Sequence, residues 1–380
     1  MSERSQNRLH GEPVRILQWG MTDNIGGMET FLMGVYRNID RSRLQFDFLT
    51  AHDRNIAFAD EIESLGGRIF RITYGQRENP LKARSCLDEF FRDHPEIRGI
   101  HMHSCFMTYA LPLVYAKRHG VPIRIYHSHN SGDMYTSHNP LRGILEHMTR
   151  RTVGRSATEL FACSDEAGRY MFHDLPFRSI HNGIDTERFA FDRTVRQQVR
   201  QELGLQDRFV IGMVGRLQYQ KNPQWALQVF AQVRRMRDDA VLCLVGDGPD
   251  REEVRSLAED LGVEDSVLFL GIRRDTQRLY QAFDTYLMTS RFEGLPVVLI
   301  EAQCAGLPCL VSDSVSREAA VTDLVRFVSL DRSAQEWAKT LIDHAAAEDA
   351  RQSRKDVLQT KGYDSHIVAK QLEQYYLNRC

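Results

Sequence analysis

The chain has 380 residues and a formal net charge of −2 at pH 7. This length favours two domains, each able to bury its own core. The charge balance gives no reason to expect nucleic acid binding, which usually needs a strongly basic face. The seven cysteines are scattered without a C-x-x-C pair, so neither a disulfide framework nor a zinc site is predicted.

The start of the chain, residues 1–13, is polar and lacks the apolar core of a signal peptide. No run of residues approaches the ~20 apolar positions of a membrane span. We therefore expect a reducing cytoplasmic location, in which any membrane contact is peripheral and at the inner face.

Strand-like and helix-like segments alternate along the first half of the chain. Apolar patterns predict strands at residues 14–19, 44–50, 68–72, 99–103, 123–127 and 159–163. Helical spacing predicts helices at residues 28–39, 57–65, 80–93, 106–119 and 141–154, and Ser164 can cap another. This alternation predicts an α/β domain with a mostly parallel, doubly wound sheet.

A second alternating series follows a polar helix predicted at residues 193–203. Strands are predicted at residues 209–214, from 241, and at 267–270, 285–289, 309–312 and 327–329. Helices are predicted to begin at Pro223 and after Gly294, and an amphipathic helix is predicted at 363–377. We expect a flexible start at 1–13, a first domain at 14–190, a second at 191–361, and a terminal helix within 362–380.

The segment 291–301 predicts a binding site for an anionic ligand. Gly294 permits a tight turn after the strand, Pro296 suits the first turn of a helix, and Gly306 supplies its C-terminal stop. The helix is therefore predicted to start at Leu295 or Pro296. Its free N–H groups would point to the strand end, where open α/β sheets bind ligands.

Two glutamates separated by seven residues belong to this segment. Glu293 precedes the helix, whereas Glu301 lies in a helix that is apolar almost all round and is therefore expected to be buried. A buried carboxylate needs a partner. Glu301 has two interpretations, an acceptor for a neighbouring backbone N–H or a ligand-binding group.

Cations follow another predicted strand. Arg216 and Lys221 lie on a loop that starts with Gly215, and together they suit a clamp for a diphosphate. The alternative is that both side chains are simply solvated. A third loop carries Gly26 and Gly27 before a helix, which permits close approach of a ligand but also suits an ordinary turn.

His129 follows the predicted strand at 123–127, at the sheet edge where ligands bind. A lone histidine in such a place is more often structural. The helix at 141–154 and its end are basic, through Arg142, Arg150, Arg151 and Arg155. A solvated face is the simpler interpretation, and a patch that meets anionic lipid or a lipid diphosphate is the alternative.

Two other enzyme classes have weaker support. Gly246 and Gly248 suggest a dinucleotide fingerprint, but Pro249 follows and no third glycine has the required spacing, which disfavours a nicotinamide-dependent oxidoreductase. A hydrolase is disfavoured because Glu293 and Glu301 do not form a pair of acid and base carboxylates.

The motifs together resemble one family. The E-x7-E segment from Glu293 to Glu301, the G-G-M-E loop at Gly26, the G-R-x4-K-N segment at Gly215 and the N-G-I-D segment at Asn182 are similar to those of retaining, nucleotide-sugar-dependent glycosyltransferases of group 1. This large bacterial group is related to glycogen synthase. The chain is closest to members that build exopolysaccharide or capsule, and the resemblance covers nearly its whole length.

The resemblance implies a GT-B fold, with two Rossmann-like domains and a last helix that crosses back to the first. It implies that Glu293 and His129 face the donor sugar and that Glu301 holds the ribose. Further donor contacts are implied at Gly26, Gly27, Arg216, Lys221, Ile272, Arg273, Gly294 and Leu295. The donor is expected to be UDP-linked, bound without a metal or other cofactor.

The predicted function is therefore retaining transfer of a sugar to a saccharide or lipid-linked saccharide acceptor. A nucleotide-sugar binding protein without catalysis is the alternative, and the oxidoreductase is a weaker one. The sequence leaves open the sugar, the base, the acceptor and the oligomeric state.

Overall fold

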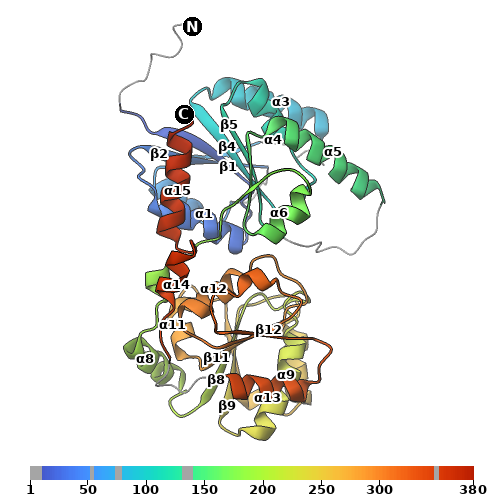
Figure 1. Cartoon of the computed structure of the whole chain (residues 1–380), viewed down its shortest axis with the longest axis vertical. Helices are drawn as coiled ribbons and strands as arrows, with labels where there is room; N and C mark the ends of the chain where they lie inside the picture. Colours follow the sequence, from blue (N-terminus) through green and yellow to red (C-terminus); the bar gives the residue numbers. More distant parts are fainter. Residues whose placement is uncertain (1–10, 52–54, 73–78, 131–139, 346–350) are drawn as a thin grey trace. The chain divides into compact units, whose positions relative to one another are not determined.

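The computed structural model describes the whole chain except residues 1–10, 52–54, 73–78, 131–139 and 346–350 (Figure 1). It divides into two compact units, of which the first comprises Met1–Asn182 with Ser365–Cys380 and the second Gly183–Asp364. The division falls before the boundary expected at residue 190. The short helix α7 (Thr186–Phe189) belongs to the second unit, where Thr186 donates a hydrogen bond to Asp364 at 2.5 Å.

The first unit is built on a seven-stranded parallel sheet in the order β3-β2-β1-β4-β5-β6-β7. Its strands are β1 (Val14–Trp19), β2 (Leu44–Thr50), β3 (Ile69–Arg71), β4 (Ile97–Ser104), β5 (Ile123–Ser128), β6 (Glu159–Ala162) and β7 (Arg178–Ser179). Its helices are α1 (Gly27–Asn38), α2 (Ala59–Ser64), α3 (Pro80–Asp93), α4 (Leu111–Arg118), α5 (Pro140–Ser156), α6 (Asp165–Phe172) and α15 (Ser365–Leu377).

The last helix, α15, completes the core of the first unit. It lies beside α1 in Figure 1, and Val368, Ala369, Leu372 and Tyr376 join the same buried cluster as β1 and β2. The Tyr376 ring stands edge-on to Phe46, with ring centroids 5.9 Å apart. The predicted return of the last helix to the first domain is thus confirmed.

The second unit contains a six-stranded parallel sheet in the order β10-β9-β8-β11-β12-β13. Its strands are β8 (Phe209–Val214), β9 (Ala240–Val245), β10 (Val267–Gly271), β11 (Thr285–Met288), β12 (Cys309–Ser312) and β13 (Val325–Val328). Its other helices are α8 (Arg193–Leu203), α9 (Pro223–Met236), α10 (Arg251–Asp260), α11 (Thr276–Ala282), α12 (Val297–Cys304), α13 (Ala334–His344) and α14 (Lys355–Thr360), with 3-10 turns at Glu264–Ser266 and Arg317–Ala319.

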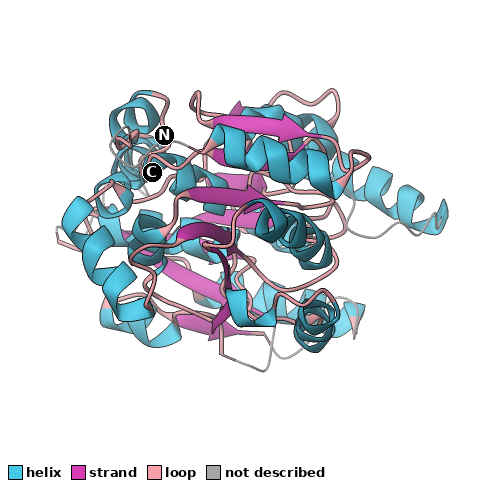
Figure 2. Ribbon diagram, turned by 90° about the horizontal axis from the view of Figure 1, so that it is seen from below, coloured by secondary structure: helices cyan, strands magenta, loops and turns pink. Residues whose placement is uncertain are grey.

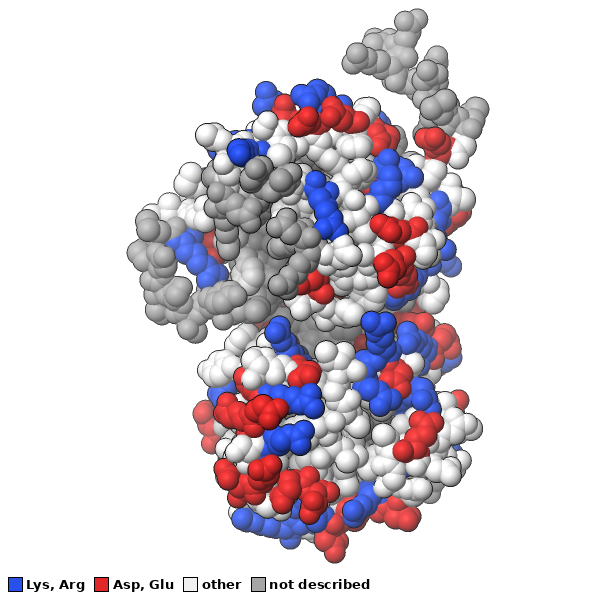
Figure 3. Space-filling view, turned by 180° about the vertical axis from the view of Figure 1, so that it is seen from behind, with Lys and Arg blue, Asp and Glu red and all other residues white. Residues whose placement is uncertain are grey.

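In both units the strands lie between helices (Figure 2), which confirms the predicted α/β, doubly wound architecture. Lysine and arginine are interspersed with aspartate and glutamate on the face drawn in Figure 3. All seven cysteines are free thiols. Among the described residues, no helix combines the length and apolar character needed to cross a bilayer.

Two predicted helices begin later than expected. The helix predicted at 106–119 starts at Leu111, because the Ser104 hydroxyl accepts from the Phe106 amide at 3.2 Å and donates to its carbonyl at 2.7 Å, which makes a turn. Helix α12 starts at Val297, with Pro296 in the N-cap position. Its end agrees with the prediction, since Gly306 follows it at φ 70°.

The tightness of packing in the second unit can be tested by substitution of Gly212. A Cβ at Gly212 would lie 2.1 Å from the ring of Phe283, which is fully buried. We expect Gly212→Ala to lower the free energy of unfolding by about 1–3 kcal/mol, because the ring has no free space to enter. Urea denaturation followed by tryptophan fluorescence suits the measurement, because Trp225 and Trp337 lie in this unit.

Gly143 provides the matched control. It lies on the exposed part of α5, where an added Cβ would meet nothing within 4 Å. Gly143→Ala should leave stability unchanged or raise it by about 0.5–1 kcal/mol, because alanine favours the helix. Equal destabilisation by the two substitutions would contradict the packing argument.

Candidate functional site

Two loops of the second unit are tied together where the strand order reverses, between β8 and β11. The Arg291 amide, after β11, donates to the Gln220 carbonyl, after β8, at 2.8 Å. The Gln220 side chain donates to the Phe292 carbonyl at 3.1 Å, and the Thr289 hydroxyl to the Asn222 carbonyl at 2.9 Å. The loops that carry the predicted donor-binding residues therefore share one edge of the sheet.

A salt bridge between two largely buried side chains also joins the two loops. Lys221 Nζ lies 2.7 Å from Glu293 Oε1, and the side chains are only 15% and 7% exposed. The sequence predicts a phosphate contact for Lys221 and a sugar contact for Glu293, and the structure brings the two groups into direct contact. Arg216, on the same loop as Lys221, is exposed.

Glycines permit the close packing of the loops after β8 and β9. A Cβ at Gly246 would lie 2.1 Å from the Gly215 carbonyl oxygen, and a Cβ at Gly248 would lie 2.1 Å from that of Leu217. The Leu217 amide donates to the Asp247 carbonyl at 3.0 Å. The G-x-G pattern thus serves contact between two backbones, which leaves the dinucleotide interpretation without support. Sequence reasoning missed this role because the partner positions are 31 residues away, Gly215 for Gly246 and Leu217 for Gly248.

Glu301 is buried in α12, and its partner is a phenol. The Tyr280 hydroxyl lies 3.0 Å from Glu301 Oε2, and Glu301 is 8% exposed. Burial raises the pKa of Glu301 to about 7, while the Tyr280 hydrogen bond and the charge of Arg188 lower it. The neighbouring backbone N–H suggested by the sequence is therefore not the partner found for this carboxyl group.

The start of α12 offers backbone donors. Pro296 makes no side-chain cap, and Gly294 and Leu295 form the turn that leads into the helix. First-turn N–H groups that lack a cap attract anions, and the helix dipole adds to this effect.

The predicted base-binding residues lie after β10. Ile272 is 79% exposed, which is unusual for isoleucine and leaves an apolar surface free to stack. The Arg273 guanidinium makes two hydrogen bonds to Asp275, at 2.7 and 2.8 Å, so this side chain is held by its own loop.

In the first unit, Gly26 and Gly27 stand at the start of α1. The Gly26 amide donates to Glu29 at 3.1 Å, and Thr22 donates to the same carboxylate through its amide and its hydroxyl. Glu29 is 4% exposed and therefore holds the glycine loop in shape. Sequence reasoning did not single out Glu29, although its position in the G-G-M-E segment was the available signal.

His129 lies directly after β5 and belongs to a cluster of buried histidines. His129 Nε2 is 2.9 Å from His103 Nδ1, and His103 Nε2 is 3.0 Å from Gln18 Oε1. His101 Nε2 is 3.2 Å from His127 Nδ1. Burial lowers the pKa of His129 to about 3 and holds those of the other three well below the ordinary value.

The sequence singled out His129 alone, but its spacing held a signal for the cluster. His101 and His103 alternate along β4, and His127 and His129 alternate along and just after the neighbouring β5, so their side chains share one face of the sheet. Ligating atoms of His101, His103 and His127 lie within 4.8 Å of one another, which is close enough to consider a metal ion.

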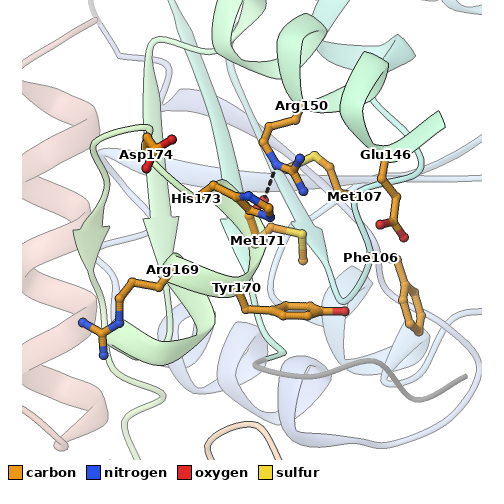
Figure 4. Close-up of a pocket in the computed structure, with 9 residues that line it drawn as sticks. All are labelled: Phe106, Met107, Glu146, Arg150, Arg169, Tyr170, Met171, His173 and Asp174. Carbon is orange, nitrogen blue, oxygen red and sulfur yellow. Dashed lines mark hydrogen bonds between the residues drawn. The ribbon is translucent and has the colours of Figure 1, made fainter. Parts of the chain in front are cut away.

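The four arginines on α5 have different surroundings. Arg150 donates to the Met171 carbonyl at 3.0 Å, and Arg142 pairs with Glu146 at 2.9 Å. Arg151 and Arg155 are exposed. Figure 4 shows Arg150 and Glu146 in the wall of a cavity of ≈ 420 Å³, whose other labelled residues are Phe106, Met107, Arg169, Tyr170, Met171, His173 and Asp174.

Comparison with known proteins adds independent information. The model of the family described as glycosyl transferases group 1 matches residues 195–357, and that of glycosyltransferase family 4 matches residues 25–188. The putative glycosyltransferase EpsF of Bacillus subtilis is 36% identical over 365 residues, which cover 94% of each chain. An Escherichia coli UDP-galactose:α-D-GlcNAc-diphosphoundecaprenol α-1,3-galactosyltransferase is 29% identical over 56% of this chain and 57% of its own.

Solved structures show the same fold. HepE of Anabaena in complex with UDP superposes with a TM-score of 0.77 at 19% sequence identity, over 95% of this chain and 99% of HepE. HepE in complex with UDP-glucose superposes with a TM-score of 0.71 at 19% identity, over 96% of this chain and 98% of HepE. These matches and the two parallel-sheet units agree with the resemblance, and the chain therefore belongs to the group 1 glycosyltransferases of the GT-B fold.

Proposed function

We propose that this glycosyltransferase transfers a sugar from a UDP-linked donor, with retention at the anomeric carbon, to a saccharide or lipid-linked saccharide acceptor in exopolysaccharide or capsule synthesis. The observation that carries the proposal is the Lys221–Glu293 contact at the edge where β8 and β11 end, next to the uncapped start of α12. HepE, with the same fold, has been solved with UDP and UDP-glucose, which supports the choice of donor.

In this proposal the second unit binds the donor and the first binds the acceptor. Arg216, Lys221 and the N–H groups at the start of α12 stabilise the negative charge of the departing diphosphate. Glu301 accepts from the ribose hydroxyls, Ile272 and the backbone of Arg273 meet the base, and Glu293 and His129 orient the sugar. The Lys221–Glu293 pair holds the lysine in place before the donor binds and avoids an unpaired buried charge.

Substitution of the two glutamates is expected to affect UDP binding and turnover differently. Glu301→Gln should weaken binding of both UDP-sugar and free UDP by about 1.5–3 kcal/mol, because it removes a charged acceptor. Glu293→Gln should leave UDP affinity nearly intact, since it also releases Lys221, and should lower turnover. Calorimetry with UDP and steady-state kinetics on both variants test this, and equal loss of UDP binding would contradict the assignment.

The raised pKa of Glu301 adds a pH signature to the same test. Because the group is protonated below about 7 in the free protein and ionised above, its acceptor strength should increase as pH rises through that value. UDP affinity of the unaltered protein should therefore rise relative to that of Glu301→Gln, whose side chain does not titrate. The ratio of the two affinities cancels the titration of UDP itself, and a flat ratio would contradict the role of Glu301.

Metal independence is the second expectation. The sequence contains no Asp-x-Asp pair, and the cations Arg216 and Lys221 with the α12 start can take the place of a divalent ion at the diphosphate. Turnover should be unchanged in excess chelator. Loss of turnover that magnesium or manganese restores would contradict this expectation.

We also propose that α5 contacts the inner face of a membrane. Ile144, Leu145 and Met148 are 59%, 46% and 62% exposed, and helical spacing places Arg151 and Arg155 on the continuation of the Ile144–Met148 stripe. Exposed apolar side chains next to cations are typical of helices that lie at an anionic bilayer surface. The diphosphoundecaprenol acceptor named for the E. coli relative favours a lipid-linked substrate here as well.

Vesicle sedimentation tests this contact. Binding to phosphatidylglycerol vesicles should exceed binding to phosphatidylcholine vesicles and weaken with salt. The double substitution Arg151→Glu and Arg155→Glu should abolish the preference. Arg235→Glu with Arg332→Glu, an equal charge change on exposed parts of the second unit, should not. Equal binding to both kinds of vesicle, or binding to neither, would show that the arginines only form a solvated helix face.

A further inference from the structure

Six polar side chains of the first unit form two hydrogen-bonded rows that meet at one glutamine, and five of them are buried while His129 is partly buried. One row runs from His129 through His103 to Gln18, with contacts of 2.9 and 3.0 Å. The other runs from Tyr376 of α15 through His101 to His127, with contacts of 2.6 and 3.2 Å. Gln18, His101, His103, His127 and Tyr376 are each at most 3% exposed.

Neutral imidazole has one donor and one acceptor nitrogen. The role of one ring nitrogen in its contact therefore fixes the role of the other nitrogen in the next contact of the row. Burial holds the pKa of all four histidines below its ordinary value, so the rings are neutral at physiological pH. Gln18 Oε1 can only accept, so His103 carries its proton on Nε2. His103 Nδ1 is then an acceptor, and His129 must donate to it from Nε2.

The second row has the same direction. Burial raises the pKa of Tyr376 well above its ordinary value, and the nearby Gln18 side chain opposes this shift, although the Gln18 amide nitrogen lies outside regular hydrogen-bond geometry. A hydroxyl that faces an N–H group donates elsewhere, here to His101 Nδ1 at 2.6 Å. His101 then donates from Nε2 to His127 Nδ1.

We propose that Gln18, His103 and Tyr376 are positioning residues that hold His101, His103, His127 and His129 in a single common tautomer, with the proton on Nε2. His129 consequently keeps Nδ1 as an acceptor. Burial lowers the pKa of His129 and the nearby Asn182 side chain raises it, although Nδ1 of His129 and Oδ1 of Asn182 make no hydrogen bond of regular geometry.

A metal ion held by His101, His103 and His127 is the competing interpretation of the same cluster. The hydrogen bonds favour the tautomer row, since both nitrogens of His101 and of His103 already have partners. A metal would have to displace these contacts. The experiment below separates the two interpretations.

Long-range ¹H–¹⁵N spectra of the histidine rings identify tautomers directly. We expect four buried rings with the Nε2–H pattern, unchanged by chelator and unchanged between pH 6 and pH 8, a window well above these depressed pKa values. Single substitutions of each histidine to glutamine assign the signals. Mixed tautomers, the Nδ1–H pattern, or a pattern that changes on addition of chelator would overturn the proposal. This measurement needs no substrate, so it stands apart from the proposed function.

Tyr376→Phe tests whether the hydroxyl on α15 fixes the tautomers of its own row. It removes the donor to His101 from a residue on α15. The pattern of His101 and His127 should become mixed in this variant, whereas His103 and His129, which belong to the row that ends at Gln18, should keep the Nε2–H pattern.

The matched control is Tyr375→Phe, which removes the same atom from the adjacent residue, whose hydroxyl lies 3.5 Å from Glu159. It should leave the ring spectra unchanged. An equal change of the ring spectra in the two variants, or an unchanged Nε2–H pattern in Tyr376→Phe, would overturn the proposal. An intact Nε2–H pattern in a protein that does not turn over UDP-sugars would leave the tautomer row standing and contradict the proposed function.

Discussion

The contact between Lys221 and Glu293 depends on two loops that lie about 70 residues apart and must stay within hydrogen-bond distance of each other. Parallel order in the sheet places β8 beside β11, and hydrogen bonds from the Arg291 amide and the Thr289 hydroxyl to carbonyls of the facing loop set the separation of the loops. Gly246 allows a third loop to press against the first. The charged groups at this edge are therefore positioned by contacts that hold the two loops together.

The first unit uses a different means to fix polar groups. Its histidines are neutral and buried, so their positions depend on hydrogen bonds, whose directions must agree along the whole row. In the second unit the polar groups are fixed by charge and hydrogen bonding. Lys221 and Glu293 form an ion pair, and Glu301 accepts a hydrogen bond from the Tyr280 hydroxyl.

Hydrophobic periodicity and turn chemistry predicted most of the fold. The strands at residues 14–19, 44–50 and 209–214 and the helix at 80–93 have the predicted bounds, because local apolar pattern and caps decide them. The late start of α4 was missed because a single serine turn at Ser104 overrides helical spacing. Motif spacing led to Glu293, Lys221 and Glu301, but it could not show their partners, since these come from other loops and helices. Predicting the histidine row would have required knowing which strands are neighbours in the sheet. The sequence around Tyr376 gives no indication that its hydroxyl contacts a histidine.

The position of α15 has a consequence for synthesis on the ribosome. The second unit is one continuous stretch, Gly183–Asp364, whereas the first needs residues from both sides of that stretch to close its core. Domains generally fold in the order in which they emerge, N-terminal first. In this chain the second unit can complete its fold before the first. Until α15 has been synthesised, the first unit still exposes the apolar surface that Val368, Leu372 and Tyr376 will cover. The nascent chain thus has to protect that surface during the translation of 182 residues, from Gly183 to Asp364.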